Sequence, residues 1–326
     1  MILAAGALGI LALSVWASGA NPSEALSTLF KGTLGSPGAI SGTLRETTPL
    51  LFTGLAVYIA LRAGLFNIGV EGQFLVGAMT GGAVILRIPG PFGIMLSLIC
   101  GAFGGLAWAA APGWIRAYRN GHEVITTIML NSVALYLTSY VVSGPLKDPA
   151  QQSPTTVNIA PDSRLPWMVN LPPVQLSWAL PMAVMAALLL AWWLRKTVAG
   201  YELEAVGAGP RAANYAGINT ARTIFLAMLG SGAIAGFAGA IQVLAYEGRF
   251  YAGFSPGYGF DALGVALLAG NYATGVIPAA ILFGILAKGG TALQIFGIPK
   301  GITTVFLGLI ILVSAAIRYR RVSVAG

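Results

Sequence analysis

Charged residues are scarce in this sequence. Only 9% of its 326 residues are Asp, Glu, Lys or Arg, whereas 56% are hydrophobic and the mean hydropathy is +0.80. Soluble domains carry about 25% charged residues. A chain of this length with so few charges cannot build a water-facing surface, which excludes a globular cytosolic enzyme, a nucleic-acid-binding module and a disordered protein.

Residues that bind metals or perform covalent chemistry are also few. The one cysteine, Cys100, lies in an apolar run, so neither a disulfide framework nor a cysteine metal site is expected. The one histidine, His122, is expected in a loop. The sequence has no Walker A motif, HExxH motif, nucleophile elbow or pair of carboxylates at catalytic spacing. We therefore expect no catalytic residue, metal or cofactor, and the chain cannot hydrolyse ATP by itself.

Long apolar runs are what the sequence has instead, and they predict an all-α, polytopic membrane protein with a single domain over residues 1–326. A spanning helix needs about 20 mostly apolar residues. Ten candidate spans lie at residues 2–19, 48–62, 70–86, 92–112, 124–143, 175–194, 223–245, 260–270, 275–288 and 301–317. The spans that begin at Thr48, Phe260 and Gly275 are short, which indicates broken or tilted helices inside a bundle.

Three segments carry signals beyond their hydropathy. The first span, 2–19, is expected to be a retained helix rather than a signal peptide, because the first basic residue is Lys31. The letters NPSE (21–24) predict a helix start, and residues 21–41 are expected to lie at the membrane interface. The proline-rich residues 144–173 predict an irregular outer loop, which is either a docking surface or a linker.

Basic residues set the expected orientation. If the C-terminal tail is cytoplasmic, ten spans also place the N-terminus inside, and residues 113–123 and 195–222 form the larger inner loops. The inner segments then hold nine Lys and Arg in about 48 residues, and the outer segments hold eight in about 92. This difference in density agrees with the positive-inside rule, and basic inner loops also account for the net charge of +8 without a nucleic-acid partner.

Polar residues at membrane depth are costly and usually functional. The first group is Asn67, Glu71 and Gln73, in a glycine-rich stretch that breaks the helix, with Phe66 beside it. These residues either contact a polar solute or, in the alternative, Glu71 pairs with Arg62 or nearby backbone and holds the broken helix together.

A second group is Phe260 and Asp261, in letters (FDALGV, 260–265) that echo FNIGV at 66–70. In the ten-span arrangement the two motifs open helices that run in opposite directions. Paired interruptions of this kind indicate an inverted repeat around a central pathway. Asn131, two turns into the span that follows Glu123, is expected to face either this pathway or a neighbouring helix.

The inner loop 195–222 is predicted to hold two short helical pieces around Gly209-Pro210. Its size suits a helix that lies along the membrane surface and fits a cleft on a partner. An ordinary amphipathic interface helix is the alternative.

Together these motifs resemble the permease subunits of bacterial ABC importers. The resemblance is to the branched-chain amino acid and ribose permease superfamily, and within it to the nucleoside-type permeases that work with basic-membrane-protein-type lipoproteins. It runs from about Asn21 to Tyr319. The letters that carry it are GLFNIGVEGQ (64–73), EVITTIMLN (123–131), the loop 200–218, and GFDALGVALL (259–268).

The resemblance implies a division of labour. A solute-binding lipoprotein would deliver a nucleoside to the outer face of the bacterial inner membrane. This chain and a second, related permease subunit would form the pathway through the lipid. ATP-binding cassette subunits would dock inside, and the candidate coupling residues are Glu202, Glu204, Ala205, Gly207 and Gly217.

Three alternatives remain. The nearest is a sugar permease of the ribose type, against which the letters NIGVEGQ (67–73) argue. An ion-coupled secondary transporter would have to rely on Glu71 and Asp261 as its buried acids. A membrane-embedded enzyme is disfavoured by the missing catalytic groups.

Overall fold

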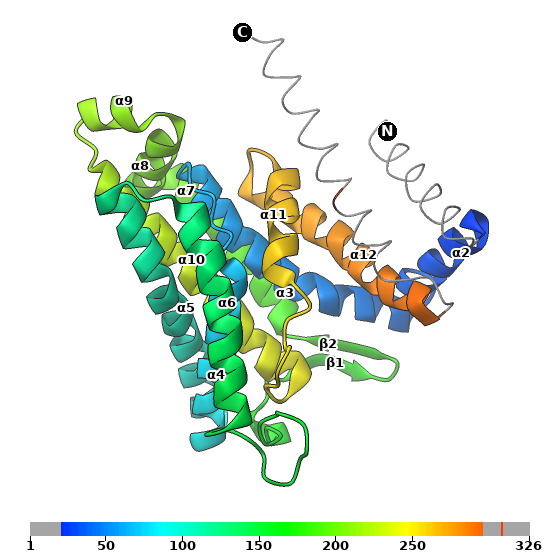
Figure 1. Ribbon diagram of the computed structural model, residues 1–326. Helices are drawn as coiled ribbons and strands as arrows, with labels where there is room; N and C mark the ends of the chain where they lie inside the picture. The colour runs from blue at the N-terminus through cyan, green and yellow to red at the C-terminus, as the bar shows by residue number, and fades with distance from the viewer. Residues whose placement is uncertain (1–20, 296–307, 309–326) are drawn as a thin grey trace.

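The computed structural model describes residues 21–295 and residue 308. The candidate span 2–19, the candidate span 301–317 apart from residue 308, and the basic C-terminal tail lie outside these residues. The described chain is mainly helical and holds one small β-hairpin (Figure 1). Within it, five helices are long and apolar enough to cross a membrane, which confirms an all-α, multi-pass membrane protein.

The described part of the chain starts with two helices, which include most of the residues 21–41 expected at the interface. α2 (Pro22–Thr33) starts where predicted, because Asn21 Oδ1 accepts a hydrogen bond of 3.0 Å from the Ser23 N–H. α3 (Pro37–Arg62) has 26 residues, so the expected start at Thr48 and the expectation of a short span there are wrong. The expected span left out the polar residues before Thr48, but their side chains find partners: Thr43 Oγ1, for example, donates to the Thr33 carbonyl at 2.9 Å.

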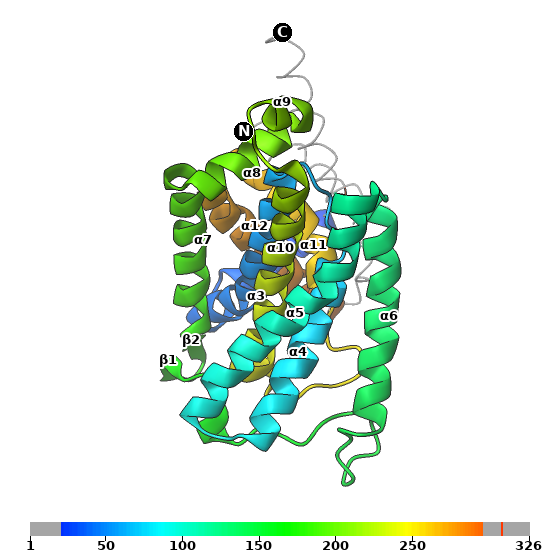
Figure 2. The same cartoon turned by 90° about the vertical axis from the view of Figure 1, so that its left-hand side faces the viewer.

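Three helices pack tightly against one another: α4 (Val70–Arg87), α5 (Pro91–Arg119) and α10 (Thr220–Gln242). Their contact is built from small residues, which allow membrane helices to approach closely. Gly77 on α4, Gly105 on α5 and Gly236 on α10 lie so close together that a Cβ on any of them would collide with a neighbouring backbone. α6 (Glu123–Ser143) covers α4 and α5 on one side (Figure 2).

The outer loop 144–173 is more regular than predicted. It contains a 3-10 turn at Pro161–Ser163 and the strand β1 (Trp167–Leu171), which pairs antiparallel with β2 (Val174–Ser177). The expected span start at Gln175 is therefore wrong, and α7 (Ala179–Lys196) begins after the hairpin. The apolar letters of β2 lengthen the hydrophobic run, but Ser41 fixes this strand to α3 through hydrogen bonds of 3.0 and 2.7 Å with the Gln175 backbone.

Two short helices follow α7 at one end of the molecule (Figure 1). They are α8 (Val198–Ala208) and α9 (Pro210–Tyr215), and they match the two pieces predicted around Gly209-Pro210.

The C-terminal part of the described chain starts where α10 ends in a π-helical segment, Val243–Glu247. α11 (Tyr258–Ala269) has 12 residues and is short, as predicted. After a 3-10 turn (Ala273–Gly275), α12 (Val276–Ile295) runs for 20 residues against α3, so the expectation of another short span is wrong.

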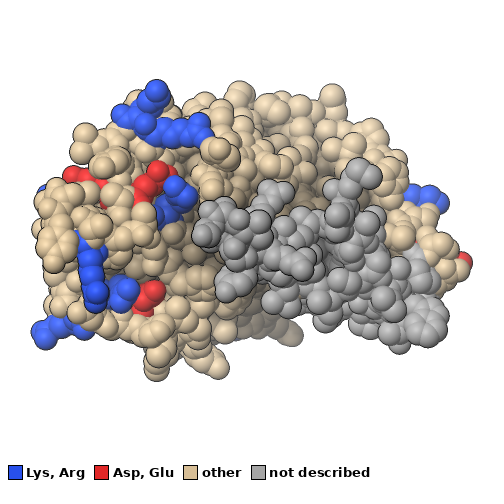
Figure 3. Space-filling view, turned by 90° about the horizontal axis from the view of Figure 1, so that it is seen from above, with Lys and Arg blue, Asp and Glu red and all other residues tan. Residues whose placement is uncertain are grey.

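Basic side chains gather at the end that carries α8 and α9 (Figure 3). The elements that end or begin there bring Arg62, Arg116, Arg119, Arg195, Lys196, Arg211 and Arg222. Toward the opposite end lie Arg45, Arg87, Lys147, Arg164 and Arg249, and Lys31 of α2 and Lys288 of α12 belong to neither group. This distribution supports the predicted placement of the α8–α9 end on the cytoplasmic side.

Candidate functional site

The chain between α3 and α4 is a break inside the helix bundle. Asn67 is fully buried there, and its Oδ1 accepts a hydrogen bond of 3.0 Å from the Gly69 N–H. Its Nδ2 donates to Gln73 Oε1 at 3.0 Å and to Ser231 Oγ at 2.8 Å. Ser231 in turn donates to the Ala56 carbonyl at 2.6 Å. These bonds satisfy polar groups that a helix break leaves without regular partners.

Glu71 joins the first turn of α4 to the first turn of α11. Its carboxylate accepts a hydrogen bond of 2.7 Å from the Gly259 N–H, and only 7% of the residue is exposed. A carboxylate is favoured at this position because the N-terminal end of a helix carries a partial positive charge. Of the two structural partners considered from the sequence, backbone is the one observed, since Arg62 pairs with Glu204.

Asn131 reaches the same break from α6. Its Oδ1 accepts a hydrogen bond of 2.9 Å from the Gly72 N–H, and its Nδ2 donates to the Ile68 carbonyl at 2.9 Å. Both polar atoms of the Asn131 side chain are therefore hydrogen-bonded to backbone at the start of α4.

The N-termini of α4 and α11 meet, and the two helices run toward opposite ends of the molecule. Just beyond α4, the Gly90 N–H donates to Ser163 Oγ in the outer loop at 2.8 Å. Just beyond α11, the Tyr272 ring lies 5.0 Å below the Arg195 guanidinium of α7. These directions agree with the expectation from the two glycine-flanked motifs, while an inverted repeat of the whole chain stays a prediction.

The predicted pathway residues fall into two sets. Asn67, Glu71, Gln73 and Asn131 form the buried network described above. Phe260, by contrast, is 48% exposed on α11, and Asp261 and Phe66 are partly exposed. The sequence-based assignment missed Ser231, because a lone serine in an apolar span has no distinguishing pattern.

The α8–α9 pair is attached to the C-terminal end of α3. Arg62 donates to Glu204 Oε1 from Nε at 3.1 Å and from Nη2 at 2.6 Å. Gly207 lies directly against the Arg62 carbonyl, with which a Cβ at this position would collide. The pair also has a small core of its own, made of Val206, Ala213 and Ile218.

The other face of this pair carries exposed aromatic rings. Tyr201 is 68% exposed and Tyr215 is 93% exposed. Glu202 and Ala205 are partly exposed on α8, and Gly217 is exposed beyond α9 with a φ of 86°, a conformation that favours glycine. Exposed aromatic residues on a small, rigid helical pair are typical of a protein–protein contact.

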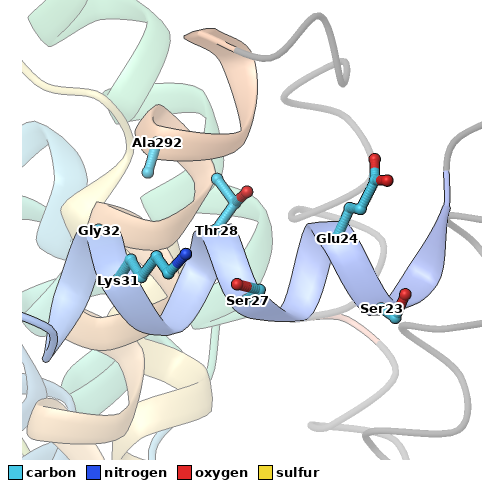
Figure 4. Close-up of a pocket in the computed structure, with 7 residues that line it drawn as sticks. All are labelled: Ser23, Glu24, Ser27, Thr28, Lys31, Gly32 and Ala292. Carbon is cyan, nitrogen blue, oxygen red and sulfur yellow. The ribbon is translucent and has the colours of Figure 1, made fainter.

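A separate cavity of about 660 Å³ lies between α2 and α12, away from both sites (Figure 4). One residue of α12, Ala292, lines this cavity. The other lining residues belong to α2 and are Ser23, Glu24, Ser27, Thr28, Lys31 and Gly32.

Interrupted helices that meet inside a multi-pass bundle, with a rigid helical pair attached at the basic end, define the architecture of a membrane transport protein. Residues 39–315 match the family described as "Branched-chain amino acid transport system / permease component". The chain belongs to this family.

Similar proteins include three permeases with assigned solutes. The guanosine ABC transporter permease protein NupP of Bacillus subtilis (strain 168) is 38% identical over 96% of this chain and 90% of its own length. The glucose ABC transporter permease protein TsgB13 of Haloferax volcanii is 35% identical over 95% of this chain and 83% of its own length. The nucleoside ABC transporter permease protein NupB of Lactococcus lactis subsp. cremoris (strain MG1363) is 34% identical over 92% of this chain and 85% of its own length. No solved structure matches the chain significantly.

Proposed function

We propose that this chain is the permease subunit of an ABC importer that carries nucleosides across the bacterial inner membrane. ATP hydrolysis takes place on separate ATP-binding cassette subunits, which dock on α8 and α9. A second, related permease subunit completes the pathway, and a solute-binding lipoprotein delivers the nucleoside from outside. The observation that carries this proposal is the contact of an exposed helical pair with the broken helices through Arg62, Glu204 and Gly207.

The contacts of α3 connect the docking surface to the interior. A displacement of α8 acts on Arg62 through an ion pair and on residues 62–64 through backbone contact. The break begins at these residues and leads to Asn67, which is hydrogen-bonded to both α4 and α10. Rigid-body motion of α8 and α9 on ATP binding thus reaches the point where α4 and α11 meet.

Phe260 and Asp261 line the pathway in this proposal, because they combine partial exposure with a position next to the α4–α11 junction. Phe66 is assigned to the pathway with them. Asn67, Glu71, Gln73 and Asn131 shape the pathway from behind by fixing the broken backbone.

Nucleosides are the first choice of solute because two of the three similar permeases carry guanosine or nucleosides in their names. A sugar is the second candidate, favoured by the 35% identical glucose permease. Uptake into proteoliposomes that hold the complete transporter and internal ATP tests both solutes. Guanosine uptake that requires the lipoprotein and ATP is expected, and uptake of glucose with no response to guanosine would contradict the nucleoside assignment.

The same proteoliposomes test the energy source. Uptake is expected to follow internal ATP and to ignore protonophores. Solute accumulation without ATP, driven by a proton or sodium gradient, would instead establish a secondary transporter.

A further inference from the structure

A second polar group lies on the outer side of the α4–α11 junction. Tyr258, the first residue of α11, donates its hydroxyl to Glu46 Oε2 at 2.8 Å. Arg45 Nη2 donates to Glu247 Oε1 at 3.3 Å. The group therefore connects α3, the π-helical end of α10 and α11. Tyr258 directly precedes Gly259, the residue that binds Glu71, so the group adjoins the proposed pathway.

This group offers more hydrogen-bond acceptors than donors. Glu247 accepts from Arg45, Gln242 and Tyr251 at distances of 3.3–3.4 Å, which is the outer limit of a hydrogen bond. In the part of the chain that the structure describes, Glu46 accepts one side-chain hydrogen bond, from Tyr258. A carboxylate has about four lone-pair sites, so both carboxylates can accept further bonds.

Gln242 adds an independent observation. Its side chain belongs to a residue that is only 4% exposed, and its Nε2 donates to Glu247. Its Oε1 has no hydrogen-bond partner among the described residues. Exchanging the amide oxygen and nitrogen of Gln242 would place Oε1 against the Glu247 carboxylate, which cannot donate a hydrogen bond. The other orientation of the amide therefore also leaves Oε1 without a donor. A buried acceptor in this state can accept a hydrogen bond from a bound donor.

Aromatic rings border the acceptor group. The Phe254 ring lies 4.9 Å from Phe250 and 5.4 Å from Tyr251, measured between ring centroids. Burial, and then the negative charge of Glu247, raises the pKa of Tyr251, so its hydroxyl stays protonated and remains a donor. Tyr251 is partly exposed, and with Arg249 and Thr155 it lines a cavity of about 210 Å³ at the outer end. The Tyr251 hydroxyl donates to Glu247 Oε2 at 3.4 Å, so this residue connects the cavity to the acceptor group.

We propose that Glu46, Glu247 and Gln242 bind the vicinal hydroxyls of a ribose, while the base stacks on Tyr251. Hydroxyl groups are donors, which is the chemistry that two carboxylates and an unsatisfied amide oxygen require. Base–aromatic stacking tolerates any base, because every base has a π-face. Arg45 pairs with Glu247 and so compensates one of the two carboxylate charges. This site rests on the proposed function and specifies where its substrate class is bound.

Photolabelling of the assembled transporter tests the location. The complex of this chain with its permease and ATPase partners, without the lipoprotein, is irradiated with 8-azidoadenosine, and the labelled peptides are identified by mass spectrometry. We expect label within residues 246–258. Adenosine should protect this segment at roughly tenfold lower concentration than 2′,3′-dideoxyadenosine, since one hydrogen bond to a charged acceptor corresponds to about that ratio. Label elsewhere, or equal protection by the two nucleosides, would overturn the proposal.

Variants assign the hydroxyl recognition to named residues. Glu46→Gln and Glu247→Gln should reduce the adenosine preference about tenfold, toward equality. The matched control, Glu24→Gln on the exposed face of α2, should leave it unchanged. Because Glu247→Gln also removes an ion pair, Gln242→Met provides a second variant that keeps the charge and should lower the preference in the same direction. A preference that survives in all three variants would overturn the site.

The site and the proposed function fail in different ways. Lipoprotein-dependent nucleoside uptake with label outside residues 246–258 would remove the site and leave the function intact. A labelled site in a transporter that imports no nucleoside would remove the function instead.

Discussion

Arg62 and Glu204 form a two-donor ion pair across the junction of α3 and α8, with Nη2 2.6 Å and Nε 3.1 Å from the same carboxylate oxygen. The Arg62 side chain is 28% exposed and that of Glu204 is 37% exposed. Partly exposed pairs of this kind contribute about 0.2–1 kcal/mol to stability. The pair is therefore suited to linking two elements that move together rather than to holding the fold.

Reversing one charge should break this link without unfolding the protein. Arg62→Glu and Glu204→Arg are each expected to lower solute-stimulated ATP hydrolysis at least about tenfold, while the double exchange restores part of it. ATPase assays on the reconstituted transporter measure this effect, with assembly checked by size-exclusion chromatography. Full stimulation of ATP hydrolysis by solute in both single variants would show that the Arg62–Glu204 pair does not couple the ATPase subunits to the pathway.

Gly207 should be sensitive to the smallest side chain. Gly207→Ala forces a Cβ into the Arg62 carbonyl and pushes α8 away from α3, so ATP-coupled uptake should fall severalfold or more. Gly209→Ala is the matched control, because its new Cβ would meet only Ala212 at 3.8 Å. Equal uptake by the two variants would mean that α8 and α3 need not touch.

Glu71 should act through hydrogen bonding. Glu71→Gln keeps an acceptor for the Gly259 N–H and should retain transport. Glu71→Ala leaves that N–H buried without a partner, at a cost of about 1–3 kcal/mol, and should lower the thermal unfolding temperature in detergent. Lost transport in a stable, assembled Glu71→Gln variant would show that the charge itself is needed.

The small residues of α10 should differ in their tolerance of alanine. Gly236→Ala collides with backbone of α5 and should destabilise the protein by about 1–3 kcal/mol. Gly230→Ala, on the same helix, would contact only the tip of Ile59 at 3.6 Å and should be close to neutral. Thermal unfolding of the two purified variants compares them directly, and a smaller loss for Gly236→Ala than for Gly230→Ala would contradict the packing argument.

Accessibility should separate the two sets of pathway residues. In a Cys100→Ser background, Phe260→Cys should react with small polar thiol reagents, because 48% of this residue is exposed. Asn67→Cys should react much more slowly, since Asn67 is fully buried. Resistance of position 260 in every nucleotide state would remove α11 from the pathway.

The sequence predicted the parts of this fold that rest on composition and on local signals. Apolar length located most of the helices, and the NPSE letters located the start of α2, because both depend on neighbouring residues. The glycine-flanked motifs also indicated where α4 and α11 are interrupted, since glycines and a charged residue within an apolar run both disfavour an unbroken membrane helix.

Features that depend on distant partners could not be predicted. The first half of α3 is helical because its polar groups bind remote residues: Ser41 binds Gln175, and Arg45 binds Glu247. The same dependence concealed β2, because the Gln175 backbone is held by the distant Ser41. Which polar residues face inward was also beyond the sequence, because the Asn67–Ser231 contact joins positions 164 residues apart.

The glycine contact among α4, α5 and α10 has a consequence for how the molecule can open. Backbone lies directly against backbone at Gly77, Gly105 and Gly236, so no side chain is present there to change rotamer and absorb a shift. These three helices must consequently travel as one stiff block. The deformation of a transport cycle is left to segments outside the block, among them the α8–α9 pair, which meets α3 through the partly exposed Arg62–Glu204 pair. The solute pathway and the ATPase docking surface would then be coupled through a rigid body of three helices.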